Sequence, residues 1–104
     1  FQEFARRHGD FAIAAAGCLI KIDNNIIEDI AISIGGVEDV PRRFTECEDV
    51  LRGMRYDIDD IKTHVREPLS QINYLDDSLV TGAYRRRLLK GLLIRAIEQA
   101  ASRS

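Results

Sequence analysis

The side chains best able to take part in chemistry gather at the start of the chain. They are Gln2, Glu3, Arg6, Arg7, His8, Gly9 and Asp10. The arginines and the histidine could supply positive charge to a bound group, and the two carboxylates could oppose it. The alternative is a structural role, in which the arginines pair with acidic residues elsewhere in the domain and the aspartate caps a turn. We treat this charged segment as the candidate binding element.

Motifs for an independent catalytic or metal site are missing from the sequence. The seven glycines form neither a G-x-G-x-x-G pattern nor a P-loop. His8 and His64 lack the cysteine or carboxylate spacing of a zinc site, and no C-x-x-C is present for an iron–sulfur cluster. No serine–histidine–acid partnership stands out either. We therefore predict no catalytic residue and no metal ligand in this chain.

Length and composition indicate one globular domain spanning residues 1–104. Hydrophobic residues make up 45% and charged residues 31% of the chain, which is ordinary for a folded domain. No apolar run approaches the roughly 18 residues of a membrane span. We expect Cys18 and Cys47 to be reduced thiols of a cytoplasmic protein, with a disulfide as the alternative. The sequence opens without a methionine inside what reads as a structured segment, so we interpret it as a fragment of a longer polypeptide.

Two strands are predicted in the first third of the chain. Residues 11–22 are almost continuously apolar, which is typical of a strand covered on both faces. Residues 26–34 alternate with the period of two expected of a strand. Asp23, Asn24 and Asn25 between them favour a tight turn, so the two strands should form an antiparallel hairpin.

Three helices are predicted after the hairpin. Thr45 and Glu48 fit a capping box that opens a short helix, which Gly53 stops. Residues 58–67 have helical apolar spacing behind a possible Asp57 N-cap, and this helix should end near Pro68. Residues 68–80 are a connector of uncertain structure. A long final helix follows the Thr81 cap, with an apolar stripe of Leu88, Leu89, Leu92, Leu93, Ala96, Ile97 and Ala100.

These elements predict an α+β fold with two layers. About three antiparallel strands should form a small sheet, with the three helices packed on one face. Because a two-stranded hairpin is marginally stable by itself, a third strand is expected from residues 1–5, around Arg43 or around Asn73.

Four stretches in the same order resemble the C-terminal domain of the flavin-carrying medium subunit of molybdenum hydroxylases. The similarity is to the carbon monoxide dehydrogenase type and to the corresponding part of xanthine dehydrogenase. The stretches are residues 1–17, then Gly35, Gly36 and Val37 with Pro41 and Arg43, then residues 48–53, then Asp77 with residues 81–86.

The resemblance implies a part of an FAD-dependent oxidoreductase that is inactive as an isolated fragment. In such an enzyme electrons pass from molybdopterin on a large subunit, through [2Fe-2S] clusters on a small subunit, to FAD. The resemblance implies that residues 2–10 lie near the flavin, which the preceding domains mainly hold, and that this domain packs against the partner subunits. It also implies that an arginine of the helix opening pairs with Asp77. Relatives often carry a lysine where this chain has Gln2 and Glu3, so a direct lysine–flavin contact is not expected.

The charge distribution supports a competing hypothesis. Residues 82–104 carry six basic side chains and one acid, although the whole chain has a net charge of −2. Such a helix could belong to a free-standing interaction module that docks on nucleic acid or on an acidic protein. Alternatively, the helix lies beside the acidic part of its own domain. The sequence does not identify a substrate or an electron acceptor.

Overall fold

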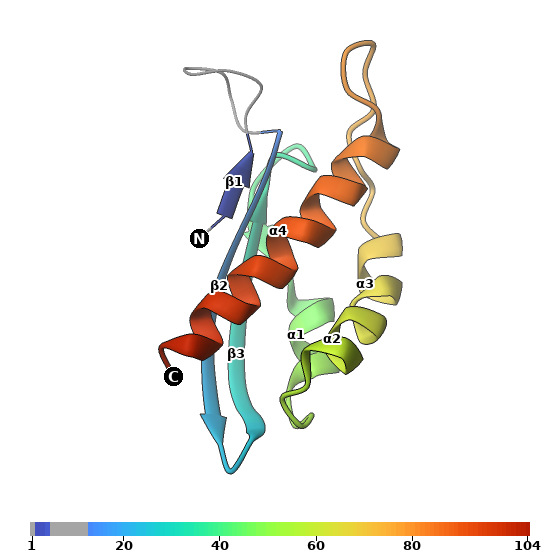
Figure 1. Ribbon diagram of the computed structural model, residues 1–104. Helices are drawn as coiled ribbons and strands as arrows, with labels where there is room; N and C mark the ends of the chain where they lie inside the picture. Colours follow the sequence, from blue (N-terminus) through green and yellow to red (C-terminus); the bar gives the residue numbers. More distant parts are fainter. Residues whose placement is uncertain (1, 5–12) are drawn as a thin grey trace.

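A computed structural model describes residues 2–4, with only the backbone of Phe4, and residues 13–104. Within these residues the elements are β1 (Gln2–Phe4), β2 (Ala14–Asp23), β3 (Ile26–Gly35), β4 (Arg42–Arg43), α1 (Thr45–Leu51), α2 (Ile58–His64), α3 (Arg66–Ser70) and α4 (Gly82–Ser102). The strands form one antiparallel sheet in the order β1-β2-β3-β4, with helices beside it (Figure 1). The predicted α+β class is confirmed.

The β2–β3 hairpin forms where the sequence predicts it. Asp23 pairs with Ile26, and the two residues between them have positive φ, 50° at Asn24 and 64° at Asn25. Positive φ at both central positions is the geometry of a type I′ turn, whose twist matches that of the paired strands. Asparagine tolerates this conformation better than most residues, which explains the tight connection.

The sheet has one strand more than the expected three among the described residues. β1 pairs with the start of β2, and β4 pairs with the end of β3. Two of the three places considered for a third strand are therefore strands, whereas the segment around Asn73 is not. Each short strand covers part of one edge of the hairpin, where backbone groups would otherwise be unpaired.

The helix predicted over residues 58–67 is two helices, α2 and α3, that meet at Val65. Pro68 does not end this segment, as was expected, but lies in the first turn of α3. A proline has no N–H to donate to the carbonyl four residues earlier, yet it is tolerated in a first turn, where that donor has no partner in the helix. The break one turn before Pro68 thus accommodates the ring. Asp57 caps α2, accepting from the backbone of Asp59 and Asp60.

The capping box predicted at the start of α1 is wrong. Phe44 is the N-cap residue, and no side chain accepts a hydrogen bond from the first turn. The Glu48 carboxylate instead accepts from the backbone N–H of Ile32 in β3, at 2.8 Å. A long-range partner has displaced the local one that the spacing suggested.

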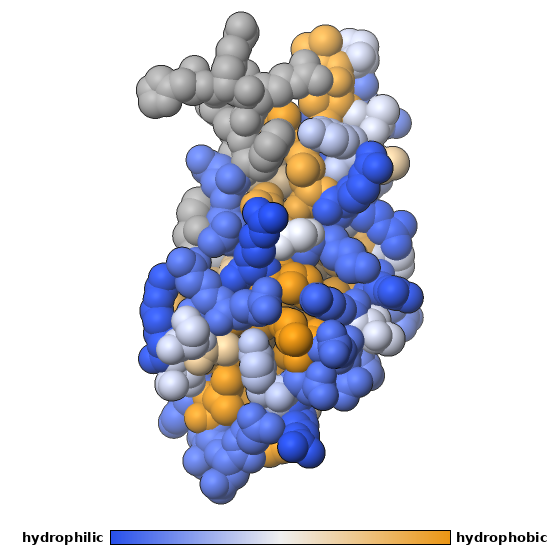
Figure 2. Space-filling view, in the orientation of Figure 1, coloured by the Kyte–Doolittle hydropathy of each residue, from blue (hydrophilic) through white to orange (hydrophobic). Residues whose placement is uncertain are grey.

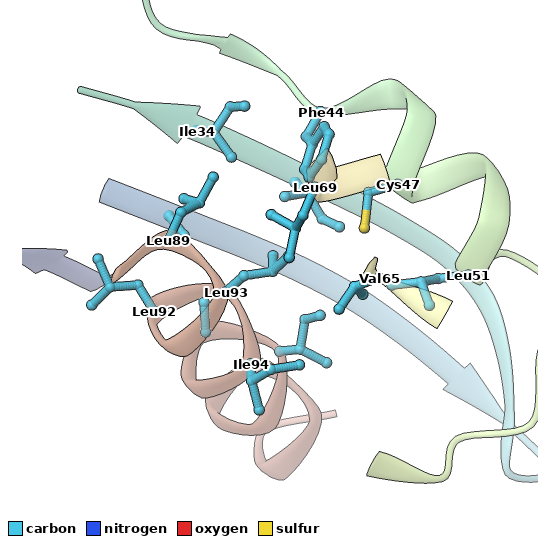
Figure 3. Close-up of a cluster of buried hydrophobic side chains, with 14 of the residues drawn as sticks. Ile34, Phe44, Cys47, Leu51, Val65, Leu69, Leu89, Leu92, Leu93 and Ile94 are labelled. Atoms are coloured by element: carbon cyan, nitrogen blue, oxygen red, sulfur yellow. The ribbon is translucent and has the colours of Figure 1, made fainter. Parts of the chain in front are cut away.

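The core lies between the sheet and the helices. α4 crosses β2 in Figure 1, and Leu89, Leu93 and Ile97 of its predicted stripe are fully buried. Figure 3 shows leucines of α4 gathered with Phe44, Leu69 and other buried side chains of the remaining helices and β3. The opposite face of the sheet is more open, since Leu19 is 76% exposed there. No helix among the described residues is long and apolar enough to cross a membrane.

Candidate functional site

The structure describes two of the seven predicted site residues. Gln2 and Glu3 form most of β1. The other five, Arg6, Arg7, His8, Gly9 and Asp10, lie outside the described residues, so their placement near a ligand stays a prediction. What the structure defines is the edge of the sheet from which this segment departs.

Gln2 fixes the start of the segment against the last helix. It pairs with Ala16 of β2, and its amide Nε2 donates to Oε1 of Gln99 in α4 at 3.0 Å. Its side chain therefore points to the helix-covered face of the sheet. The residue is occupied by a structural contact, which binds β1 to the C-terminal half of α4.

Glu3 lies on the opposite face, because successive side chains of a strand alternate. It is exposed and pairs with Ala15. Glu3 contributes to a hollow of about 460 Å³ on the open face of the sheet. We name this the open-face hollow; its lining is Glu3, Ala15, Ser33, Ile34, Gly35, Gly36, Glu38, Asp39, Pro41 and Leu75.

The open-face hollow combines small residues with carboxylates. Ala15, Gly35 and Gly36 carry little or no side chain, so a flat group could approach the backbone closely. Gly36 has a φ of 78°, which favours glycine at that position. Two acids from other segments, Glu38 and Asp39, join Glu3 in the lining. The Gly35–Gly36 pair was visible in the sequence, but its meeting with β1 depends on pairing across the sheet.

A clamp of three charged residues holds one wall of the open-face hollow. Arg42 Nε donates to Glu38 Oε1 at 2.6 Å, and Arg42 Nη1 donates to Glu46 Oε1 at 2.9 Å. The hydrogen bond from Arg42 is the main reason that the pKa of Glu46 lies below its usual value. The loop before β4 is thereby tied to α1.

The predicted pair between Asp77 and the opening of α4 is confirmed. Arg85 Nη2 lies 3.2 Å from Asp77 Oδ2, and Arg85 Nη1 donates to the carbonyls of Leu75 and Val80, both at 2.8 Å. Arg85 is not part of the predicted apolar stripe of α4, yet the residue is only 7% exposed. The pair organises the connector before α4, and the Thr81 hydroxyl caps that helix by accepting from Tyr84.

The described residues offer little for independent catalysis. Cys18 and Cys47 are free; burial raises the pKa of Cys18 to about 11 and that of Cys47 to about 12. Both thiols are therefore protonated at neutral pH and are poor nucleophiles. No group of three or more histidine, cysteine, aspartate or glutamate residues in the described part of the chain could hold a metal ion.

Comparison with known proteins identifies the class of this helix-backed sheet. The family of CO dehydrogenase flavoprotein C-terminal domains matches residues 1–100. The chain belongs to this family, which makes it the C-terminal domain type of molybdenum hydroxylase medium subunits. The resemblance noted from the four sequence stretches is thus confirmed.

Three individual relatives illustrate the match. The chain is 36% identical to the glyceraldehyde dehydrogenase medium chain of Sulfolobus acidocaldarius, covering 97% of this chain and 36% of the relative. It is 37% identical to the caffeine dehydrogenase subunit beta of Pseudomonas sp. (strain CBB1), covering 99% and 35%. The crystal structure of quinoline 2-oxidoreductase from Pseudomonas putida 86 superposes with a TM-score of 0.84 at 25% identity, covering 97% and 35%. The chain thus spans about a third of these relatives.

Proposed function

We propose that this chain is the C-terminal domain of the FAD-binding subunit of a molybdenum-dependent hydroxylase, in which electrons pass from molybdopterin through [2Fe-2S] clusters to FAD. The match of the flavoprotein family to residues 1–100 is the observation that carries the proposal. Family membership favours this role over the free-standing interaction module. The relatives act on unrelated substrates by their names, so no substrate is assigned.

The residues at the β1 edge fit one wall of a flavin site and do not form a complete flavin site. FAD, when bound, would supply a ring system that accepts electrons. Ala15, Gly35 and Gly36 leave space for a flat ring, but no glycine-rich phosphate loop is present to hold the pyrophosphate. The chain would therefore border the flavin while preceding domains of the subunit hold the cofactor.

Residues 2–10 are proposed to adjust the electrostatics of that border. A negative charge next to a flavin opposes the charge that develops on reduction, so Glu3 should lower the reduction potential. Arg6, Arg7 and His8 would act in the opposite direction, and Asp10 in the same direction as Glu3. Gln2 is occupied by Gln99, so its contribution is to hold β1 in place.

The wider assembly is part of the proposal. The partners would be the preceding FAD-binding domains, a large subunit with molybdopterin and a small subunit with [2Fe-2S] clusters. We place the assembly in the cytoplasm, where the two free thiols would remain reduced. This 104-residue chain would be one domain of the longer subunit.

Two measurements test the proposal. The isolated chain should bind no FAD, and yellow flavin that co-purifies with it would contradict a site shared with preceding domains. In the complete flavoprotein, Glu3→Gln should raise the flavin midpoint potential measured by spectroelectrochemistry. Glu28→Gln is the matched control, because Glu28 is the third residue of β3, next to the turn of the β2–β3 hairpin, and Figure 1 shows this turn at the end of the hairpin remote from β1. Equal midpoint potentials in both variants and the wild type would contradict the proposal that Glu3 lies next to the flavin.

A further inference from the structure

A second hollow lies between α3 and the first half of α4, away from the β1 edge. Its volume is about 500 Å³. We name it the basic hollow; its lining is Arg66, Leu69, Ala83, Arg86, Arg87 and Lys90. Figure 2 shows mainly hydrophilic side chains over the region that these two helices occupy in Figure 1.

Helical geometry brings the four cations of the basic hollow together. Arg86 and Arg87 lie three and four residues after Ala83, and Lys90 lies four and three residues after them, which places all four on one side of α4. Arg66 opens α3, and Leu69, one turn further along, is only 1% exposed. The hollow therefore has a cationic rim, and its exposed apolar surface comes from Ala83, because Leu69 belongs to the core beneath it.

These four cations make no ion pair with any other described residue, although several other arginines do. Arg42, Arg43, Arg52 and Arg85 each lie within ion-pair distance of a carboxylate. Glu67 is next to Arg66 in the chain but forms no ion pair with the cluster among the described residues. The expectation that the basic helix is neutralised by its own domain is met, in the part described, only at Arg85. Uncompensated like charges repel one another, so an external anionic group would relieve the cluster.

We propose that the basic hollow docks an acidic segment of a neighbouring polypeptide. Its carboxylates would pair with Arg66, Arg86 and Lys90, and one apolar side chain would lie over the exposed Ala83. A polar rim around a small apolar centre is the usual anatomy of a protein–protein contact. The proposal does not rest on the flavin assignment, because it uses none of the residues at the β1 edge.

The lining argues against two other anionic ligands. Single-stranded nucleic acid binds to cationic grooves that also offer aromatic rings for base stacking. The nearby ring of Tyr84 already lies under Arg87, whose guanidinium carbon is 5.8 Å from the ring centroid. Inorganic phosphate would make no use of the apolar surface of Ala83. In the described part of the chain, Arg66, Arg86 and Arg87 are exposed side chains without hydrogen bonds that would hold them in position.

An NMR titration of the 104-residue chain tests the proposal. The probes are a short glutamate peptide with a central leucine, its glutamine counterpart, a single-stranded DNA oligonucleotide of equal charge, and inorganic phosphate. Amide shifts at Arg66, Ala83, Arg86 and Lys90 report on the hollow. Arg86→Glu with Lys90→Glu is the test variant. Arg55→Glu with Arg95→Glu is the control, since it changes the net charge equally at exposed positions outside the hollow.

The acidic peptide should shift the amides of the hollow selectively, and the test variant should weaken its binding about tenfold, because two attractive charges become repulsive. The control variant should bind as the wild type does. Arg86→Lys, which keeps the charge, should retain binding, and amides remote from the hollow verify that each variant is folded. Equal loss in both double variants, equal binding of the glutamine peptide, or tighter binding of DNA or phosphate at the same amides would overturn the proposal.

Discussion

The Glu48 carboxylate accepts a hydrogen bond from the backbone N–H of Ile32, at 2.8 Å, beside the point where β4 ends. The neighbouring carbonyl of Ile32 accepts from the backbone of Phe44. A side chain of α1 thus continues the pairing that β4 begins along the edge of β3. Arg43 completes the arrangement by donating to both oxygens of Glu48, each at 2.7 Å.

Loss of this carboxylate should destabilise the domain more than loss of a surface carboxylate. Glu48 is 2% exposed, and Glu48→Ala would leave the buried N–H of Ile32 without an acceptor, at a cost of about 2–3 kcal/mol in the free energy of unfolding. Asp49→Ala, in the same helix, removes an exposed pair with Arg52 and should cost about 0–1 kcal/mol. Urea unfolding measures both values. Similar losses in the two variants would show that Glu48 is not a structural acceptor.

The same carboxylate should make the stability dependent on pH. Hydrogen bonds from Arg43, followed by the one from Ile32, hold the pKa of Glu48 below its usual value of 4.5. The contribution of Glu48 to the free energy of unfolding is fully present above that pH, where its carboxyl is ionised in both the folded and the unfolded states. Below it the unfolded state takes up a proton first, so the free energy of unfolding falls as the pH decreases toward the lower pKa of the folded state.

Comparison of two neutralised variants isolates this effect. Glu48→Gln should flatten the decrease in stability between about pH 5 and pH 3, because its side chain no longer titrates. Asp49→Asn removes one carboxylate from the same helix and should leave most of the decrease in place. Urea unfolding at several pH values provides the measurement. A decrease that is unchanged in Glu48→Gln would contradict the assignment.

The contrast among the three predicted caps shows what local sequence could foresee. Asp57 and Thr81 cap α2 and α4 as expected, because their acceptors are two or three residues away. The Thr45–Glu48 spacing is as good a local signal. It failed because Glu48 found partners in β3 and β4, and contacts between distant segments leave no mark in local spacing. The open-face hollow escaped detection for the same reason, whereas the hairpin and the long helix depend on neighbouring residues and could be predicted.

The cap assignments yield a direct test by alanine substitution. Asp57→Ala and Thr81→Ala should each lower the free energy of unfolding by about 1 kcal/mol, since each exposes a backbone donor of a helix start. Thr45→Ala should change it by less than about 0.5 kcal/mol, because the Thr45 hydroxyl donates to the side chain of Glu46 and caps no backbone N–H of α1. Urea unfolding of the three variants distinguishes these outcomes. A loss at Thr45 as large as that at Thr81 would restore the capping box.

Arg85 should be the basic residue of α4 that the fold needs most. Arg85→Met would remove the donor that now serves the carbonyls of Leu75 and Val80, although the Val80 carbonyl would still accept from the backbone N–H of Asp77. The Nε–H of Arg85 is itself buried without an acceptor among the described residues, a cost that the substitution relieves, so the expected loss is in the middle of the usual range and not at its top, about 2 kcal/mol. Arg85→Lys should recover part of it, because an ammonium cannot reproduce the planar fork of donors.

Arg86→Met, one position along the helix, is the control and should change the free energy of unfolding by less than about 0.5 kcal/mol, since Arg86 is exposed. Hydrogen exchange gives a second measurement. The amides of Leu79 and Val80 donate to Asp77, whose other carboxylate oxygen faces Arg85. Their exchange should accelerate in Arg85→Met and not in Arg86→Met. Equal stability and equal exchange in the two variants would mean that the connector before α4 holds its shape without Arg85.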